Sequence, residues 1–246
     1  MKLYKYREIS TSDDVSFERL SSILLGQSFW CATPASLNDP EEFIWECDYT
    51  PTPSTVSLLA DLLIKYNGRD SATALEIAST SVNSDRLREL APTIVRDIIE
   101  KCRNEIGVSC FGTSASNPIM WERYGGKGAG VCIEIDVPNS YLNQLLYRVN
   151  YPLRKVIHID QLIEASLNDT SSLAVYSIAL LSKPPFWATE EEIRFISNQQ
   201  NISVNITDST ISNLTLGTLV DSVTTERILN LVNSLPYSLP ISYQQA

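Results

Sequence analysis

Apolar and polar residues recur along the chain with two different spacings, which predict a mixture of strands and helices. In residues 129–136, Val131, Ile133 and Ile135 alternate with smaller or polar residues, and this period of two is typical of a strand. Similar patterns predict further strands at 3–6, 28–33, 107–113, 145–151, 192–197, 201–206 and 214–219. The segments at 192–197 and 201–206 are expected to form a hairpin.

Apolar residues spaced three and four apart predict helices in much of the remaining chain. Two stripes rich in leucine and isoleucine cover 55–105, which is expected to be a helical insertion beside the sheet. Other helices are predicted at 17–25, 116–126, 159–183 and 221–235. Because helices occur in blocks and do not alternate regularly with strands, a parallel doubly wound sheet is not expected. We therefore predict a single α+β domain over 1–246, with a mixed or antiparallel sheet of about seven strands.

Composition and charge narrow the classes of protein to which the chain could belong. The 246 residues carry a net charge of -10, which argues against broad binding to nucleic acids because such binding uses clustered lysine and arginine. No apolar run approaches the roughly 20 residues that a membrane helix needs, and the start MKLYKYREIS lacks the apolar core of a signal peptide. Five scattered cysteines without C-x-x-C spacing indicate free thiols. A cytoplasmic protein with no membrane partner is therefore expected.

The single histidine, His158, limits the catalytic mechanisms that remain. One imidazole excludes a histidine-rich metal site, and a serine–histidine or cysteine–histidine mechanism would have to use this residue. His158 belongs to the alternating stretch RKVIHID, which has no nucleophile nearby in the sequence. A surface or structural histidine is therefore the favoured interpretation.

Three adjacent glutamates in WATEEEIRF, residues 187–195, pose a problem because neighbouring carboxylates repel each other. If this stretch is a strand, one face carries Glu190, Glu192 and Arg194. The opposite, mainly apolar face is then formed by Trp187, Thr189, Glu191, Ile193 and Phe195. Two carboxylates so close together would not titrate independently, and Arg194 would offset this by pairing with Glu192. Spacing alone favours an exposed edge protected by charge, and the alternative is an E-x-E pair that lines a cleft.

Several blocks of the chain, taken in order, resemble one bacterial family. The blocks are LYKYR (3–7), LNDPEEF (37–43), VSCFGTSASNPIMWERYGGKGAGVCIEID (108–136), YRVNY (147–151) and KPPFWATEEEIRFI (183–196). They are similar to the pattern of the bacterial "domain of unknown function 2971" family, most specifically in the central block and in K-x-x-x-W-x-x-E-x-E-x-R. Leu37 and Glu41 depart from that pattern. The resemblance implies a soluble bacterial protein and leaves its activity open.

A second resemblance is to the Arg, Ser-Thr-Ser and Glu pattern of ADP-ribosyltransferases. It implies an ADP-ribosyltransferase-like fold and an NAD-using transferase or NAD glycohydrolase, such as a toxin-like effector in phage defence. Glu192 would stabilise the positive charge that develops on the ribose, and Glu190 would orient or deprotonate the acceptor. Arg7 would hold the pyrophosphate. Tyr4 or Tyr6 is the alternative to Arg7. Ser109 or Thr113 would brace Glu192 or the nicotinamide amide, and an aromatic such as Trp121 or Tyr124 would stack on a ring of the ligand. The other residues expected to bind NAD are Tyr6, Asn38, Asp39 and Arg194.

Two other functions remain open from the sequence. A non-enzymatic module would recognise a nucleotide or a protein through the loop at Asn38 and Asp39 and the helix that carries Trp121. A metal-dependent nuclease would use carboxylates such as Glu134 and Asp136 as Mg²⁺ ligands, although the acids lack a recognisable nuclease spacing. The expected partners are a small-molecule nucleotide, with NAD as a substrate, and a protein or nucleic-acid acceptor.

Overall fold

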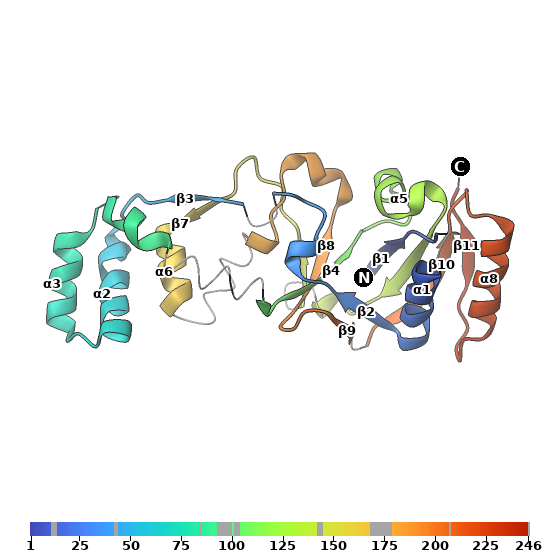
Figure 1. Cartoon of the computed structure of the whole chain (residues 1–246), viewed down its shortest axis with the longest axis horizontal. Helices are drawn as coiled ribbons and strands as arrows, with labels where there is room; N and C mark the ends of the chain where they lie inside the picture. Colours follow the sequence, from blue (N-terminus) through green and yellow to red (C-terminus); the bar gives the residue numbers. More distant parts are fainter. Residues whose placement is uncertain are drawn as a thin grey trace. The chain divides into compact units, whose positions relative to one another are not determined.

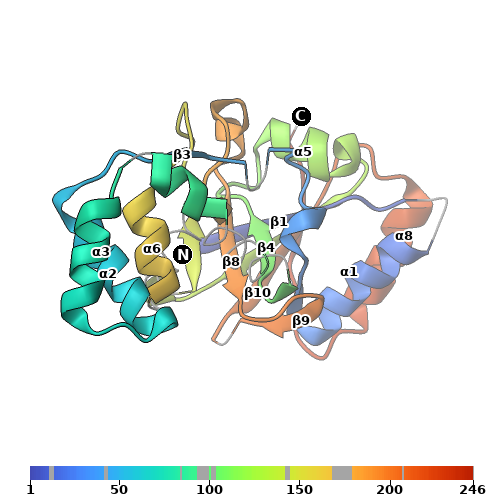
Figure 2. The same cartoon turned by 60° about the vertical axis from the view of Figure 1, so that its left-hand side comes forward.

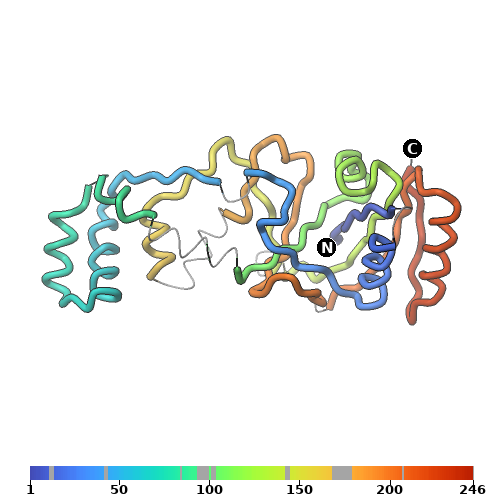
Figure 3. Tube along the Cα trace, viewed as in Figure 1, coloured from blue at the N-terminus to red at the C-terminus, as the bar shows by residue number. Residues whose placement is uncertain are grey.

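The chain divides into two compact units in the computed structural model. The structure describes residues 1–10, 14–41, 44–83, 85–92, 100, 104–141, 145–167, 179–206 and 208–245 (Figures 1 and 3). The first unit consists of Met1–Ala32, Gly107–Val149 and Phe186–Ala246, and the second consists of Thr33–Ile106 and Asn150–Pro185. The chain therefore enters the second unit twice and returns each time to the first.

The first unit contains a four-stranded sheet in the order β1-β5-β10-β11. Its strand β5 (Val131–Asp136) pairs antiparallel with β1 (Lys2–Arg7) and with β10 (Thr210–Leu216), whereas β10 pairs parallel with β11 (Ile241–Tyr243). The alternating apolar residues of β5 are all fully buried, as their period of two predicts. The structure confirms the strands β1, β5 and β10 that the sequence predicts, whereas β11 was not predicted.

The first unit also contains two smaller sheets. β4 (Gly107–Phe111), β8 (Ile193–Ser197) and β6 (Leu146–Arg148) form an antiparallel sheet with β8 in the centre. β2 (Ser28–Cys31) pairs with β9 (Ile202–Asn205). The predicted hairpin over 192–206 is therefore wrong, because alternation identifies a strand without identifying the strand to which it is hydrogen-bonded. The mixed α/β character is confirmed, with several sheets in place of one.

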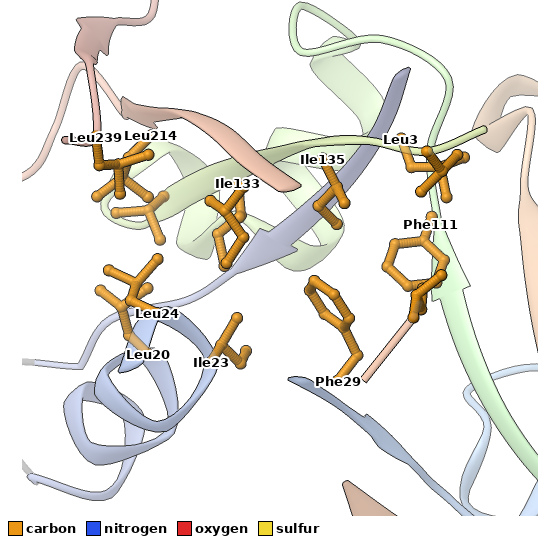
Figure 4. Close-up of a cluster of buried hydrophobic side chains, with 14 of the residues drawn as sticks. Leu3, Leu20, Ile23, Leu24, Phe29, Phe111, Ile133, Ile135, Leu214 and Leu239 are labelled. Atoms are coloured by element: carbon orange, nitrogen blue, oxygen red, sulfur yellow. The ribbon is translucent and has the colours of Figure 1, made fainter. Parts of the chain in front are cut away.

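A hydrophobic core lies between the four-stranded sheet and the helices α1 (Val15–Gly26) and α8 (Ser222–Asn233). Figure 4 shows the buried side chains of α1 pointing toward Ile133 of β5 and Leu214 of β10. The α1 residues in this core are Leu20, Ile23 and Leu24. Each such side chain contributes roughly 1.5–3 kcal/mol on burial, so the apolar stripe accounts for the position of the helix. The predicted helices at 17–25 and 221–235 are confirmed.

The short helix α5 (Pro118–Tyr124) begins as its sequence predicts. The Asn117 side-chain oxygen accepts hydrogen bonds from the backbone N–H groups of Ile119 (3.0 Å) and Met120 (3.3 Å), and Pro118 occupies the first turn. This cap sets the orientation of the helix and so positions the arginine and tyrosine of its last turn. Among the described residues, 3-10 helices form at η1 (Pro34–Ser36), η2 (Gly126–Gly128), η3 (Asn139–Tyr141) and η4 (Pro185–Glu190).

The second unit is mainly helical. α2 (Pro53–Asn67) packs against α3 (Ser71–Ser81) and against α6 (Ile159–Leu167), as Figure 2 shows. Its parallel strand pair, β3 (Glu46–Asp48) with β7 (Val156–His158), is not predicted from the sequence. Helices α2 and α3 confirm the early part of the helical region predicted at 55–105, and α6 confirms the early part of the helix predicted at 159–183. The rest of both predictions falls partly on residues 93–99, 101–103 and 168–178, which lie outside the described residues.

Throughout the ranges that the structure describes, no helix combines the length and apolar character needed to cross a membrane.

Candidate functional site

The three glutamates do not belong to one strand. The 3-10 helix η4 ends at Glu190, Glu191 has a φ of 47°, and β8 starts at Ile193. Because a positive φ turns the backbone out of the extended conformation, strand alternation does not set the directions of these side chains. The predicted alternation of faces through 187–192 is therefore wrong, whereas the strand over 193–197 is confirmed.

Glu190 is buried against α5, with only 1% of its surface exposed. Its Oε1 atom accepts a hydrogen bond from Nη1 of Arg123 at 2.9 Å and another from the hydroxyl of Tyr124 at 2.8 Å. The Arg123 guanidinium also packs on the ring of Trp187, with its carbon 4.5 Å from the ring centre. The interpretation of Glu190 as part of an exposed, solvated edge is therefore wrong.

Glu192 and Glu191 have separate environments, which removes the repulsion expected of adjacent carboxylates. Glu192 is 4% exposed and pairs with the fully buried Arg194, at 2.8 Å between Oε1 and Nε, as the sequence predicts. Glu191 is exposed and accepts a hydrogen bond from the Thr113 hydroxyl at 2.5 Å. Thr113 therefore braces Glu191 and not Glu192, which was one of the alternative contacts expected of Ser109 or Thr113.

Lys5 on β1 forms a second buried polar group with β4. Its ammonium donates hydrogen bonds to the Ser109 hydroxyl at 3.2 Å and to the carbonyl oxygen of Cys110 at 2.8 Å. Burial, and to a lesser extent the nearby charge of Arg7, lowers the pKa of Lys5 to about 8. Glu192 and Cys110 act in the opposite direction. Ser109, which is 1% exposed, thus contacts Lys5, a residue that the sequence did not single out.

A cavity of about 720 Å³ opens in the first unit beside the end of β1. Three elements line it: the end of β1 with the residues that follow, the first turns of α1, and the last turn of α5. The lining residues are Tyr6, Arg7, Glu8, Ser10, Val15, Ser16, Arg19, Arg123 and Tyr124. The cavity therefore brings together three of the residues predicted from the sequence, Arg7, Tyr6 and Tyr124, with two further arginines.

Three arginines and one acid, Glu8, line this cavity, which is named the arginine cavity, so its charged lining residues carry an excess of positive charge. Burial is the main cause that lowers the pKa of Arg7, and the like charge of Arg19 adds to it. The Nε of Arg7 is buried and has no hydrogen-bond partner in the part of the chain that the structure describes. A guanidinium donates hydrogen bonds in a planar fork that matches phosphate and carboxylate oxygens. The cavity is therefore chemically suited to an anion.

Trp121 does not reach this cavity, which corrects its predicted role. It is 2% exposed, its indole N–H donates to the carbonyl oxygen of Ala115 at 2.8 Å, and its ring meets that of Tyr6 edge to face at 5.2 Å. The Tyr6 hydroxyl donates to the carbonyl oxygen of Ser114 at 2.6 Å. Trp121 is thus a core residue that supports the cavity wall from behind, and only Tyr124 of the predicted stacking pair lines the cavity.

Asn38 and Asp39 belong to the second unit, whereas the arginine cavity belongs to the first. Asp39 is 3% exposed, and its Oδ1 accepts from the backbone N–H of Glu41 at 3.0 Å, the hydrogen bond of an Asx-turn. Asn38 is exposed on the same loop. The turn gives Asp39 a local structural role.

His158 has the structural role that its sequence context favours. Its Nε2 lies 2.9 Å from the carbonyl oxygen of Thr50, and its Nδ1 accepts from the backbone N–H of Asp160 at 3.2 Å. These contacts tie the turn before α2 to the start of α6. Across the described ranges, no three histidine, cysteine, aspartate or glutamate side chains gather as metal ligands would. Glu134, a candidate ligand in the nuclease alternative, pairs with Lys2 at 2.5 Å.

Sequence reasoning missed two of the three arginines of the cavity. Arg19 lies on the exposed side of an amphipathic helix, and Arg123 lies in the helix pattern MWERY beside a tryptophan. Neither position differs in sequence from an ordinary solvated arginine, so only the approach of α1 and α5 to β1 identifies them.

Comparisons with family models, with curated proteins and with solved structures each found no match.

Proposed function

We propose that the protein binds a nucleotide that carries a pyrophosphate, with NAD as the first substrate to test, in the arginine cavity. The observation that carries this proposal is the convergence of Arg7, Arg19 and Arg123 on one cavity. Of the three, Arg123 already pairs with Glu190 at 2.9 Å. Arg7 and Arg19 are the other two lining cations, beside one lining acid, Glu8, and the charge of Arg19 acts on Arg7.

A pyrophosphate would relieve two costs of this arrangement. Partial burial of Arg7, and second to it the like charge of the exposed Arg19, disfavour the charged guanidinium of Arg7 and lower its pKa. A dianionic group between them changes repulsion into two attractive contacts, and it supplies an acceptor for the buried Nε of Arg7. Val15 and Ser16 at the start of the 12-residue helix α1 add the positive end of a helix dipole to the same wall.

The volume of the cavity suits a nucleotide. Sites for small molecules and cofactors commonly measure about 300–1,000 Å³, and the arginine cavity measures about 720 Å³. The hydroxyl-bearing side chains of Tyr124, Ser10 and Ser16 line it beside the arginines. A ribose offers hydroxyl groups of matching chemistry.

Cleavage of NAD is the reaction that we propose for this site. In hydrolysis, water adds to C1′ of the nicotinamide ribose as the C1′–N bond breaks, and the bonding electron pair leaves with neutral nicotinamide. The proton of the water passes to a carboxylate and then to solvent. In ADP-ribosyl transfer a protein or nucleic-acid nucleophile takes the place of water. We assign the carboxylate role to Glu190, which is buried behind the cavity wall and would receive the proton through the cavity-lining hydroxyl of Tyr124, its hydrogen-bond donor at 2.8 Å.

The binding step is tested by calorimetric titration of the protein with ADP-ribose and with NAD. Arg7→Ala should weaken ADP-ribose at least tenfold, since it removes a charge-assisted contact worth roughly 1.5–3 kcal/mol. Arg7→Lys keeps the charge and loses the planar fork, so its affinity for ADP-ribose should lie between those of the wild type and Arg7→Ala. Arg154→Ala is the matched control, because Arg154 is an exposed arginine of the second unit. Unchanged affinity in Arg7→Ala would overturn the assignment of this cavity.

The reaction step is tested by measuring nicotinamide released from NAD, with and without a cell lysate as the source of an acceptor. Glu190→Gln should bind ADP-ribose at least as tightly as the wild type, because it removes a negative charge beside the cavity, and should lose nicotinamide release. Glu192→Gln tests the alternative, in which the carboxylate paired with Arg194 carries the reaction. Release that survives in both variants would refute the proposed chemistry and leave the protein as a binding module.

A further inference from the structure

Phe186 is an exposed aromatic residue beside the arginine cavity. It is the second residue of η4, belongs to the first unit and has 72% of its surface exposed. Isolated apolar residues on a protein surface are common and need no explanation. The position of Phe186 relative to Arg123 is what distinguishes it.

Arg123 lies between Phe186 and the cavity and contacts both. The carbon of its guanidinium lies 5.1 Å from the centre of the Phe186 ring and 4.5 Å from the centre of the Trp187 ring. The two rings meet edge to face, with centres 5.5 Å apart. Since Arg123 itself lines the cavity, an exposed aromatic surface begins one side chain away from the predicted phosphate site.

Holding Arg123 in place does not require Phe186. The guanidinium is already ion-paired with Glu190 and lies closer to Trp187. Had Phe186 served mainly to cover the arginine, its ring would be largely buried, yet most of its surface faces solvent. A planar apolar surface in this position is suited to a flat ring that arrives with the ligand, because aromatic stacking of a nucleic-acid base on a side chain contributes roughly 1–3 kcal/mol.

We propose that Phe186 is the stacking platform for the base of the nucleotide whose pyrophosphate lies among Arg7, Arg19 and Arg123. This inference rests on the proposed function and deepens it, since it specifies a ligand with a base rather than a sugar phosphate or inorganic phosphate. It also replaces Trp121, which the sequence suggested for stacking and which lies in the core. Binding would then combine an electrostatic contact that is independent of the base with a stacking contact that depends on it.

The two contacts separate in a titration with two probes, ADP and inorganic pyrophosphate. Phe186→Ala should weaken the binding of ADP about tenfold and leave the binding of pyrophosphate unchanged. Phe186→Trp, which keeps an aromatic ring, should bind ADP as the wild type does. Tyr243→Ala, which removes another exposed aromatic side chain of the first unit, is the matched control and should change neither. Arg7→Ala should weaken both probes.

The outcomes distinguish the inference from the proposed function on which it rests. If Phe186→Ala binds ADP as tightly as the wild type, or loses ADP and pyrophosphate equally, the stacking role is refuted while the arginine cavity stands. If the wild-type protein binds neither probe, the proposed function fails, and the stacking role fails with it.

Discussion

Two arginine–glutamate pairs, one in each unit, show how differently the same residue types are used. In the first unit Arg123 and Glu190 pair with 23% and 2% of their side chains exposed, beside a cavity and under aromatic rings. In the second unit Arg154 and Glu46 form an ion pair with 69% and 58% exposed. Water solvates and screens the charges of the exposed pair. Little water reaches the buried pair, so a charge that loses its partner there is not solvated in its place. Charge that a protein keeps in a buried place is the stronger indication of a ligand site.

The second unit uses its buried polar groups to join helices. The carboxylate of Asp160 accepts hydrogen bonds from the hydroxyls of Thr52 (2.5 Å) and Thr55 (2.6 Å), and so connects the start of α2 to α6. Thr52 and Thr55 also form the capping box of α2. These groups are matched within the unit. Buried polar atoms without a hydrogen-bond partner among the described residues occur in both units, at Nε of Arg7 in the arginine cavity and at Oδ2 of Asp39 in the second unit.

Breaking the buried pair should give the largest effect. Arg123→Ala leaves the carboxylate of Glu190 buried with Tyr124 as its remaining donor from α5, and we expect the free energy of unfolding to fall by about 3 kcal/mol. Denaturant unfolding of the purified protein measures it. The double variant Arg123→Ala/Glu190→Ala should recover part of the loss, because it removes the unpaired charge. A single variant as stable as the wild type would contradict the contrast between the two pairs.

Lys5→Met tests the cost of buried charge through pH. The folded-state pKa of Lys5 is lowered to about 8 from an ordinary value of 10.5. Between these two values the unfolded chain still holds a proton that the folded protein has released, so rising pH stabilises the wild type through this window. Between pH 7.5 and 11, the free energy of unfolding of the wild type should therefore rise by on the order of 2 kcal/mol relative to that of Lys5→Met.

Chemical denaturation of both Lys5 proteins at several pH values measures this difference. At pH 7 Lys5 is charged in both states, so the full cost of burying it is present there. A difference in stability that stays constant across the window would show that the ammonium is solvated in the folded protein.

The smallest effect is expected for the exposed pair of the second unit. Arg154→Ala removes the partner of Glu46, whose pKa is lowered chiefly by its hydrogen bond to Arg154. Because both side chains are exposed, the unfolding temperature should match that of the wild type within error. A decrease comparable to that of Arg123→Ala would mean that exposure does not separate the two pairs.

Local patterns predicted most of the elements but not their partners. The alternation in β5 and the apolar spacing of α1 identify a strand and a helix, since each element must bury one side. The same patterns suggested a hairpin between β8 and β9, although these strands pair with others. The three-residue strands β3 and β7 and the final strand β11 were missed, because so few residues carry little periodic signal.

The candidate site was predicted in part. Arg7, Tyr6, Tyr124 and Glu190 were singled out, and the structure relates them to one cavity, the first three as lining residues and Glu190 through its hydrogen bonds to Arg123 and Tyr124. Trp121 was assigned to a ligand but packs in the core. Its exposed counterpart Phe186, together with Arg19 and Arg123, passed unnoticed. Nothing in the sequence distinguishes an aromatic side chain that is buried by its neighbours from one that is left outside.

The order of residues alone determines most of the helices and longer strands, because each must bury one side and its apolar residues recur with a matching period. It also determines the helix cap at Asn117 and the turn at Asp39, since both side chains act on backbone groups two or three residues away. Only the tertiary structure decided that three arginines from β1, α1 and α5 share a cavity and that Glu190 is buried while Glu191 is exposed. Those outcomes depend on which distant segments pack together, because Glu190 is held by Arg123 and Tyr124 of α5 while the backbone at Glu191 has a positive φ.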